Sequence, residues 1–309
     1  MQAKAIWNYN AKPQPLVATN LPYPALNQPM HNELFSSALA CLQCQNTDNK
    51  LAHVASLRHA WLAGEVTQAP ESSPVIPVPV PGRPDKPEMV SALAVDKRKL
   101  STAEGRAALI HSLAHIEFNA INLALDAVYR FRHLPPEFYG DWLQVAAEEA
   151  THFALLRDHL RSQGYDYGDF TAHNGLWEMA VLTAHDPMVR MALVPRVLEA
   201  RGLDVLPGIM HKLASSGAQN AVEILKVILH DEIGHVAIGN RWYAYLCKQR
   251  DLEPLATFRA LLREYNAPRL RGPLHTAARM AAGFTEAEMK MLEDSILDSG
   301  SPGTTTTTL

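Results

Sequence analysis

The chain has 309 residues, of which 47 % are hydrophobic, and it carries a formal net charge of −4. This length and composition predict a sizeable core in one large domain, or in one domain with an extension. The mild negative charge argues against nucleic acid as a partner. We expect a cytoplasmic protein without a membrane segment, because the first residues lack a secretion signal and no apolar run reaches the length of a membrane span.

The chain contains three cysteines, Cys41, Cys44 and Cys247. An odd number of cysteines without a secretion signal argues against a disulfide framework. Cys41 and Cys44 form a CxxC motif, but the βαβ context of a redox motif is missing. We interpret the pair as two small residues of a helix.

Helical patterns begin at residue 31, and residues 31–63 predict two short helices separated by a polar turn. From Pro70 to Pro87 the chain is too rich in proline for a helix, and alternating valine and proline favour an extended strap. The predicted parts are an N-terminal helical extension, a proline-rich strap, a helical bundle, C-terminal helices and a disordered low-complexity tail, at 1–69, 70–98, 99–250, 251–298 and 299–309.

The first two long helices of the bundle have clear ends. Ser101 and Glu104 have the spacing of a capping box, which predicts a helix start, and Pro135 marks its end. The second helix follows at once and stops at Gly164, a residue typical of helix C-termini.

The third long helix is predicted to start at Asp186 and Pro187, an N-cap followed by proline at the first helical position. Pro195 and Pro207 predict a kink or a break within it. A shorter helix precedes it in a long crossover, and the fourth long helix covers about residues 218–250.

Two more helices follow residue 250, and no segment alternates convincingly with period two. The predicted class is therefore all-α: a four-helix bundle with a long crossover, preceded by a helical hairpin and a strap and followed by C-terminal helices.

A carboxylate falls in the middle of the apolar face of each long helix, at Glu117, Glu149, Glu199 and Glu232. A buried carboxylate costs several kcal/mol unless it is paired or binds a metal. Lysine and arginine are missing from these faces. One or two divalent metal ions would supply the counter-charge.

Two E-x-x-H motifs, Glu149/His152 and Glu232/His235, strengthen this interpretation. Residues three apart share a helical face. With 18 glutamates and 14 histidines in the chain, chance predicts about one such pair. Glu117 precedes Glu149 by 32 positions and Glu199 precedes Glu232 by 33, so the pattern is repeated. The predicted metal ligands are Glu117, Glu149, His152, Glu199, Glu232 and His235, the ligand set of ferritin-like di-iron and di-manganese bundles.

The alternative interpretation is that the faces are assigned wrongly and these acids meet solvent. Glu148 and Asp231 each precede a motif glutamate by one residue, about 100° round the helix, and His230, two residues before Glu232, also points elsewhere. We expect them at the surface or beside a ligand of a neighbouring helix. His111 and His115 lie off the face of Glu117, and we interpret them as structural.

At these motifs the chain resembles the ferritin-like non-haem di-iron carboxylate superfamily. The stretches "RKLSTAEGRAALIHSLAHIEFNAINLALDAVYRF", "EEATHF", "HDEIGHVAIG" and "GPLHTAARMAAGF" are most similar to an uncharacterised bacterial family known as a ferritin-like domain of unknown function. That resemblance covers about residues 31–285. It implies a fold and a metal centre but no substrate.

Two positions differ from those of better-known members of the superfamily, and these differences argue against two of the known activities. Leu156 stands where ribonucleotide reductases carry a radical tyrosine, and Leu203, beside Gly202, stands where bacterial multicomponent hydroxylases carry threonine. Neither chemistry is supported. Gly239, one turn after His235, predicts room near the metals for a small ligand or a channel.

The first hypothesis is an oxidoreductase that activates O2 or peroxide on a small-molecule substrate. Two iron ions are the expected cofactor, with Mn/Fe or Mn/Mn as alternatives, and the electron donor and oligomeric state are open. A metal-binding or ferroxidase-like protein without an organic substrate is the second hypothesis. The third, a tRNA-modifying hydroxylase, rests only on two small basic clusters, "DKRKL" and "APRLRGPLHTAARM".

Overall fold

The computed structural model describes residues 33–68, 74–95, 98–267, 270 and 272–300. These residues are all-α, as predicted, and their only β pairing consists of two isolated bridges. The helices are α1 Leu34–Gln43, α2 Thr47–Leu62, α3 Ala103–Arg130, α4 Pro136–Ser162, α5 Gly175–Leu182, α6 Pro187–Leu193, the π-helical segment η1 Val194–Glu199, α7 Ala200–Ser215, α8 Gln219–Gln249, α9 Pro254–Glu264, α10 Thr276–Ala281 and α11 Glu286–Gly300. None of the helices described is both long and apolar enough to cross a membrane.

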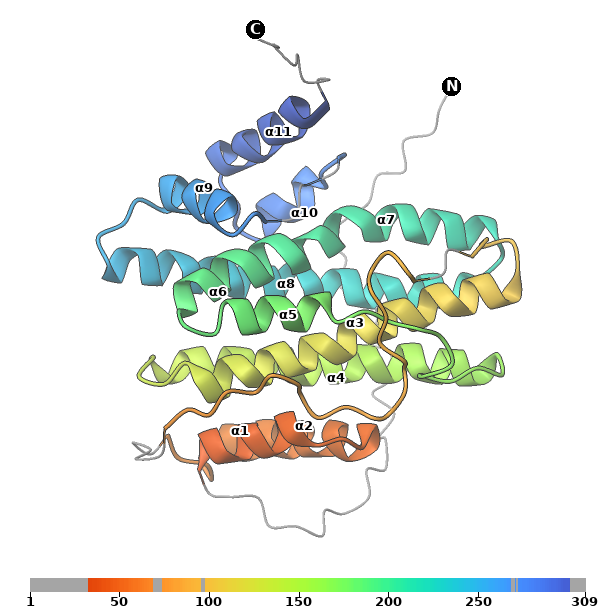
Figure 1. Ribbon diagram of the computed structural model, residues 1–309, viewed down its shortest axis with the longest axis horizontal. Coiled ribbons are helices and arrows are strands. Elements are labelled where there is room, and N and C mark those ends of the chain that lie inside the picture. Colours follow the sequence, from red (N-terminus) through yellow and green to blue (C-terminus); the bar gives the residue numbers. More distant parts are fainter. Residues whose placement is uncertain (1–32, 69–73, 96–97, 268–269, 271, 301–309) are drawn as a thin grey trace, which may run out of the picture.

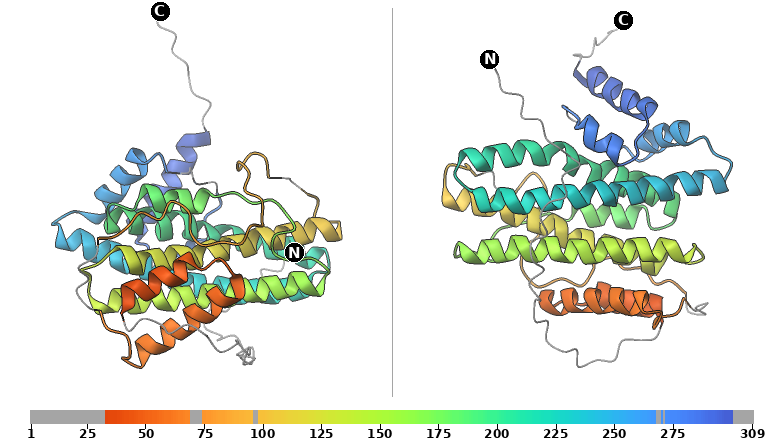
Figure 2. Two further views of the ribbon diagram at one scale, coloured as in Figure 1. Left: turned by 60° about the horizontal axis from the view of Figure 1, so that its bottom comes forward. Right: turned by 180° about the vertical axis from the view of Figure 1, so that it is seen from behind.

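The helices stack in layers (Figures 1 and 2). In the middle, α3 packs along α4, α4 packs on α8, and α8 packs on α6, η1 and α7. The hairpin α1–α2 covers the outer side of α3 and α4, while α9, α10 and α11 lie on the opposite side of the molecule. All six predicted metal ligands therefore lie in the two inner layers.

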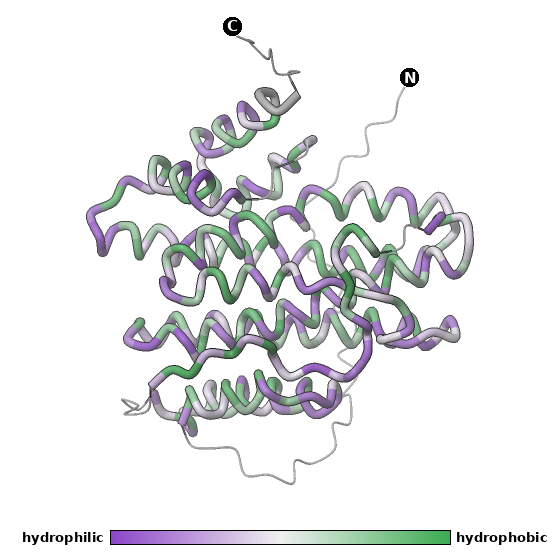
Figure 3. The backbone as a smooth tube through the Cα atoms, in the orientation of Figure 1, coloured by the Kyte–Doolittle hydropathy of each residue, from purple (hydrophilic) through white to green (hydrophobic). Residues whose placement is uncertain are grey.

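Each long helix is amphipathic, and Figure 3 shows hydrophobic and hydrophilic residues recurring along every one of them. Between the layers the hydrophobic side chains join into one core that extends from α1 to α11. Burial of these apolar faces, rather than helix propensity alone, stabilises helices of this length.

Most helix ends follow the predicted signals. Asp186 caps α6 by accepting a hydrogen bond from the Met188 amide, and Gly164 has a φ of +81° just after α4. The cap of α3 differs: the Thr102 hydroxyl accepts the Gly105 amide hydrogen at 3.0 Å. The predicted capping box at Ser101 is therefore wrong by one residue.

The two prolines of the third long helix affect the helix differently. Pro195 lies inside η1, where the Ala200 amide donates to the Pro195 carbonyl five residues back. Proline has no amide hydrogen and its ring crowds the preceding turn, which disturbs a regular α-helix at that point. Pro207 does not break the helix, and α7 continues through it to Ser215.

The strap is extended from residue 74 onward, as predicted, and residues 69–73 are outside the described part. It joins three layers by hydrogen bonds: the Gly82 amide donates to the Leu42 carbonyl at 2.8 Å, the Ile76 amide to the Tyr129 hydroxyl, and the Trp177 indole to the Pro79 carbonyl. The domain boundaries themselves stay a prediction.

The C-terminal region contains one helix that the sequence patterns did not predict, α10. The helix α11 continues to Gly300, two residues into the predicted tail, and residues 301–309 lie outside the described residues.

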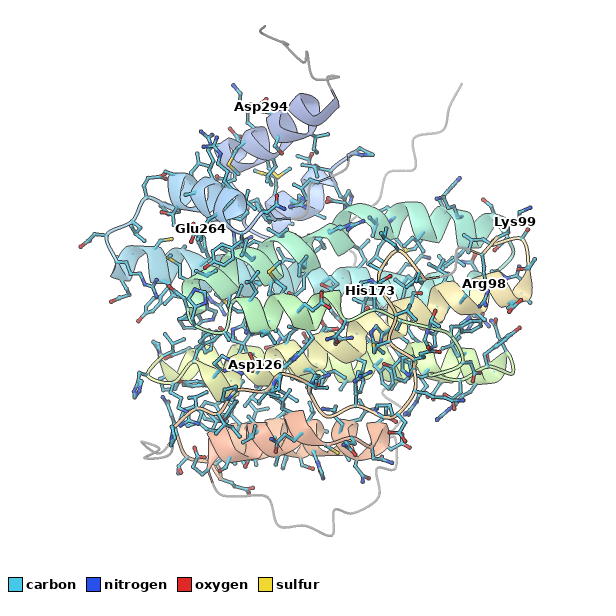
Figure 4. All side chains as sticks on the ribbon, in the orientation of Figure 1. Arg98, Lys99, Asp126, His173, Glu264 and Asp294 are labelled. Carbon is cyan, nitrogen blue, oxygen red and sulfur yellow. The ribbon has the colours of Figure 1, made fainter. Side chains whose placement is uncertain are left out.

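A buried ion pair crosses the core between α3 and α6. Asp126, labelled in Figure 4, accepts from Arg190 at 2.8 Å, and Arg130 also donates to it. Arg190 makes a further bond to the Thr183 hydroxyl at 2.6 Å. Because every partner is satisfied, the charges are tolerated inside the core.

Candidate metal centre

Four helical elements deliver the six predicted ligands to the core. Glu117 comes from α3, Glu149 and His152 from α4, Glu199 from the last position of η1, and Glu232 and His235 from α8. Glu149, His152 and His235 are fully buried, Glu117 and Glu232 are nearly so, and Glu199 is half-buried. The alternative in which these acids face solvent is therefore wrong for three of the four acids, Glu117, Glu149 and Glu232.

Four of the six side chains form one compact group. Glu117, Glu149, His152 and Glu232 each offer a ligand atom, and these atoms all lie within 4.8 Å of one another. The Nδ1 atom of His152 is 3.3 Å from Glu149 Oε2 and 3.4 Å from Glu117 Oε2. A group of three carboxylates and one imidazole within that radius could hold a metal ion.

His235 adjoins this group on the side of α8. Its Nδ1 atom is 3.0 Å from Glu149 Oε1 and 3.8 Å from Glu232 Oε1. Glu199 interacts electrostatically with Glu149, Glu232 and His235. Glu149 is thus the side chain that both histidines contact.

Two outer carboxylates hold the histidines from behind, in a crosswise arrangement. Asp231 of α8 lies 3.0 Å from Nε2 of His152 on α4, and Glu148 of α4 lies 2.8 Å from Nε2 of His235 on α8. Each acid directly precedes the glutamate of its own E-x-x-H motif and supports the histidine of the other. An acid that accepts a hydrogen bond from one ring nitrogen fixes the orientation of the imidazole and leaves the other nitrogen free for a metal.

The charges in this group perturb one another. Burial raises the pKa of Glu199 to about 8, with a further contribution from Glu232. Burial and the nearby Glu149 carboxylate also raise the pKa values of Glu117 and Glu232. These directions indicate more negative charge than the protein itself neutralises.

Glu149 and the histidines shift in the opposite sense. Burial alone would raise the pKa of Glu149, but the facing His235, together with hydrogen bonds from His152, holds it below its usual range. Burial likewise opposes protonation of both imidazoles, yet the surrounding carboxylates raise their pKa values well above the ordinary one. In the absence of metal, the histidines and the carboxyls with raised pKa values hold protons, and a bound metal ion would replace these protons.

Unsatisfied polar atoms are concentrated at this point. Within the described residues, buried atoms without a regular hydrogen bond include Glu117 Oε2, Glu199 Oε2 and Glu232 Oε2, together with Glu149 Oε1 and His235 Nδ1, which face each other at 3.0 Å as an ion pair. Buried polar atoms normally have a partner, so a cluster of orphaned ones calls for a missing ligand. Carboxylate oxygens and an imidazole nitrogen suit iron or manganese, and the residues fit such ions.

The space expected beside Gly239 is filled. A Cβ atom at this position would overlap Cβ and Cγ of Pro195. Gly239 therefore serves the close approach of η1 to α8, and the prediction of room for a ligand or channel there is wrong. Leu203, one turn after Glu199, is fully buried.

The remaining polar residues have structural partners. His111 accepts the Gly168 amide at 2.9 Å, and His115 Nδ1 is 2.8 Å from the Tyr167 hydroxyl, as expected of structural histidines. Cys41 is buried, and burial raises the pKa of its thiol to about 12, as expected of an unreactive residue. His230 is exposed.

Comparison with known proteins gives a family but no named activity. Residues 43–290 match the family described as "Protein of unknown function (DUF455)", and this range contains all six candidate ligands. A relative from Haemophilus influenzae, named "Uncharacterized protein", is 53 % identical over 213 residues, covering 67 % of this chain and 74 % of the relative. No solved structure matches the chain. Since the match spans most of its length, the chain belongs to the DUF455 family of proteins of unknown function.

Proposed function

We propose that the chain is a ferritin-like protein with a two-metal carboxylate centre, and that this centre reduces O2 or a peroxide. One observation carries the proposal: both histidines direct Nδ1 at the central carboxylates while an outer acid holds Nε2. When all four inner carboxylates are ionised, they carry four negative charges, which two divalent ions would balance.

Each residue has a defined part in this proposal. All six side chains would hold the two ions: Glu149 and Glu232 together with the histidines of their motifs, and Glu117 and Glu199 as the single carboxylate of each half. Two iron(II) ions would supply the two electrons that reduce O2 to the level of peroxide. The surrounding apolar core excludes water from the carboxylates, which strengthens their hold on the ions.

The proposal is tested by loading metal-free protein with two equivalents of iron(II) without oxygen, adding O2, and recording the absorbance spectrum. We expect two bound ions per chain and a new near-ultraviolet band after O2. A Glu232→Gln variant should lose this change, whereas Glu223→Gln, an exposed acid of the same helix, should keep it. Wild-type protein without bound metal, or without a spectral change, would overturn the proposal.

A ferroxidase-like activity without an organic substrate is the second candidate. The filled space at Gly239 and the buried Leu203 favour it, because an organic molecule would need room beside the metals. Continued oxidation of iron(II) well beyond two equivalents per chain would support this candidate. Oxidation that stops at two equivalents would support the enzyme with an organic substrate.

The tRNA-modifying hydroxylase finds less support. Of its two basic clusters, residues 96–97, 268–269 and 271 lie outside the described part. Arg279, at the end of the second cluster, is fully buried against Asp204 and is not available to a phosphate backbone. A gel shift with bulk tRNA tests this candidate.

A further inference from the structure

Two buried arginines lie on either side of Glu199, the half-buried member of the candidate centre. Arg196 precedes it by three residues within η1 and is 3 % exposed. Arg279 comes from α10 and is fully buried. Neither arginine takes part in the metal group, so their burial needs another reason.

Arg196 is held by the C-terminal helices. Its guanidinium carbon lies 4.3 Å from the ring centre of Tyr243, 4.2 Å from that of Phe258 on α9 and 5.1 Å from that of Phe284. It also forms an ion pair with Glu288 of α11. Such an aromatic enclosure with a charged partner fixes a guanidinium in one orientation.

The acid of this pair is itself fixed. Glu288 accepts the Thr285 amide at 2.9 Å and the Thr285 hydroxyl at 3.0 Å. The partner of Arg196 is thus anchored at the start of α11 by contacts with Thr285.

Arg279 holds the chain immediately after Glu199. It donates to Asp204 at 3.0 and 2.7 Å and to the Ala200 carbonyl at 3.3 Å. Asn240 of α8 donates to the Ala282 carbonyl at 2.6 Å, which ties the end of α10 to the same place. The backbone of Glu199 is therefore held from its N-terminal side by Arg196 and from its C-terminal side by Arg279.

The π-helical turn explains why the contacts of both Arg196 and Arg279 are needed. In an α-helix, residues three apart share a face, and Arg196 would then lie beside Glu199 at the metal group. A π turn takes up about one residue more, which turns the two side chains onto different faces. Glu199 can then face the metals while Arg196 faces α9 and α11. A π turn is rare, and it persists where its surroundings hold it.

We propose that Arg196 and Arg279 are positioning residues, through which the C-terminal helices α9–α11 hold η1 in its π form and Glu199 at one of the two metals. This inference rests on the proposed two-metal centre. If η1 relaxed toward an α-helix, a one-residue shift would turn Glu199 by about 100°. The metal that depends on Glu199 would then be lost, and the metal bound by Glu117 and His152 would remain.

The test measures manganese(II) binding to metal-free protein by elemental analysis and by electron paramagnetic resonance. Wild type should bind two ions per chain with the spectrum of a coupled pair. Arg196→Met and Arg279→Met should bind one ion with the six-line spectrum of an isolated ion, and their affinity for a second ion should fall at least tenfold. Arg196→Lys keeps the charge and should recover part of that affinity.

Arg157→Met is the matched control from the other half of the molecule. Arg157 is a buried arginine of α4 that pairs with Asp48 of α2 and lies over the Phe153 ring, so it fastens a helix of the first half to its own covering layer. This variant should keep two ions and the coupled spectrum. Circular dichroism checks that each variant is folded.

The outcomes separate the two proposals. Wild type that fails to bind two ions overturns the proposed function. Folded Arg196→Met and Arg279→Met variants that bind two coupled ions with wild-type affinity overturn only the positioning role, as does an equal loss of both ions. If the methionine variants do not fold, Glu288→Gln is the milder change. A folded Glu288→Gln variant should bind the second ion more weakly, and unchanged binding contradicts the proposal.

Discussion

The two halves of the candidate centre carry the same ligand pattern on different supports. In the first half, Glu117 lies on the continuous helix α3. The hairpin α1–α2 covers α3 and α4 with apolar contacts, with buried Lys50, which donates to Asn122, and with the ion pair of Arg157 and Asp48. In the second half, Glu199 ends a π-helical segment, and α9–α11 cover it with buried arginine ion pairs and aromatic rings.

This difference shows what an irregular helix needs. A regular α-helix presents its side chain at a defined angle, and non-directional apolar packing is enough to hold it. A π turn has a competing α form, so directional contacts must select it. The following predictions test the shared pattern first and then the features that differ between the halves.

The largest effect is expected for Glu149→Gln. Because both histidines contact this carboxylate, its loss should disturb both metals, and bound metal should fall from two ions to near zero per chain. Elemental analysis after dialysis measures this. Glu137→Gln, an exposed acid of α4, should bind metal like the wild type, and full metal content in Glu149→Gln would refute the site.

Acid sensitivity should come in part from the first half. Burial lowers the pKa of His111 to about 4, against about 6.5 for an unperturbed histidine. As the pH falls from 6.5 toward 4, the unfolded chain binds a proton that the folded protein does not, so stability is lost with falling pH. Between pH 7 and pH 5 this loss should be about 2 kcal/mol for His111.

Urea unfolding of metal-free wild type and His111→Gln at both pH values measures this contribution. The wild type should lose more stability than the variant, while His211→Gln, an exposed residue of α7, should behave like the wild type. Equal losses in wild type and His111→Gln would contradict the assignment.

The outer carboxylates should act crosswise. Asp231→Asn should weaken the metal bound through His152, and Glu148→Gln the metal bound through His235, each by about 10–100-fold in affinity. Competition with a chelator measures these affinities. Asp158→Asn, an exposed acid of α4, is the control, and wild-type affinity in both variants would show that the histidines need no such support.

The close approach of η1 to α8 can be broken at Gly239. Gly239→Ala should destabilise the protein by about 2 kcal/mol, because its Cβ would overlap Pro195. At Gly234 of the same helix, a Cβ would meet no described atom within 4 Å, and Gly234→Ala should instead stabilise by about 0.5–1 kcal/mol. Urea unfolding measures the change in unfolding free energy of each variant relative to the wild type. Changes of the same sign in the two variants would contradict the close approach proposed at Gly239.

Local patterns predicted the parts of the centre that lie on regular helices. The 3.6-residue period brings Glu149 and His152 to one face, and the same rule applies to Glu232 and His235. An acid alone on an apolar face calls for a counter-charge, which indicates metal before any tertiary contact is known. For that reason, the all-α class and the candidate ligands followed from spacing and burial.

The motifs also indicated the outer acids, without pairing each acid with its histidine. Asp231 and Glu148 occupy matching positions, one residue before each motif glutamate. Their rotation of about 100° away from the ligand face predicted a place at the surface or beside a ligand of a neighbouring helix. Both parts are confirmed, because each acid is partly exposed and lies against the histidine of the other motif. Each acid pairs with a histidine of the other helix. Which acid meets which histidine depends on how α4 packs against α8, and a pattern within one helix cannot predict that packing.

By itself, then, the sequence determined where most of the long helices begin and end, which faces are apolar, and which acids and histidines share a face, because these depend on neighbours within one or two turns. Only the tertiary structure decided the crosswise acid–histidine pairs, the π turn at Glu199 and the filling of Gly239 by Pro195. Each of these depends on atoms of helices that are distant in the chain, and packing brings those atoms together only once the apolar faces are buried.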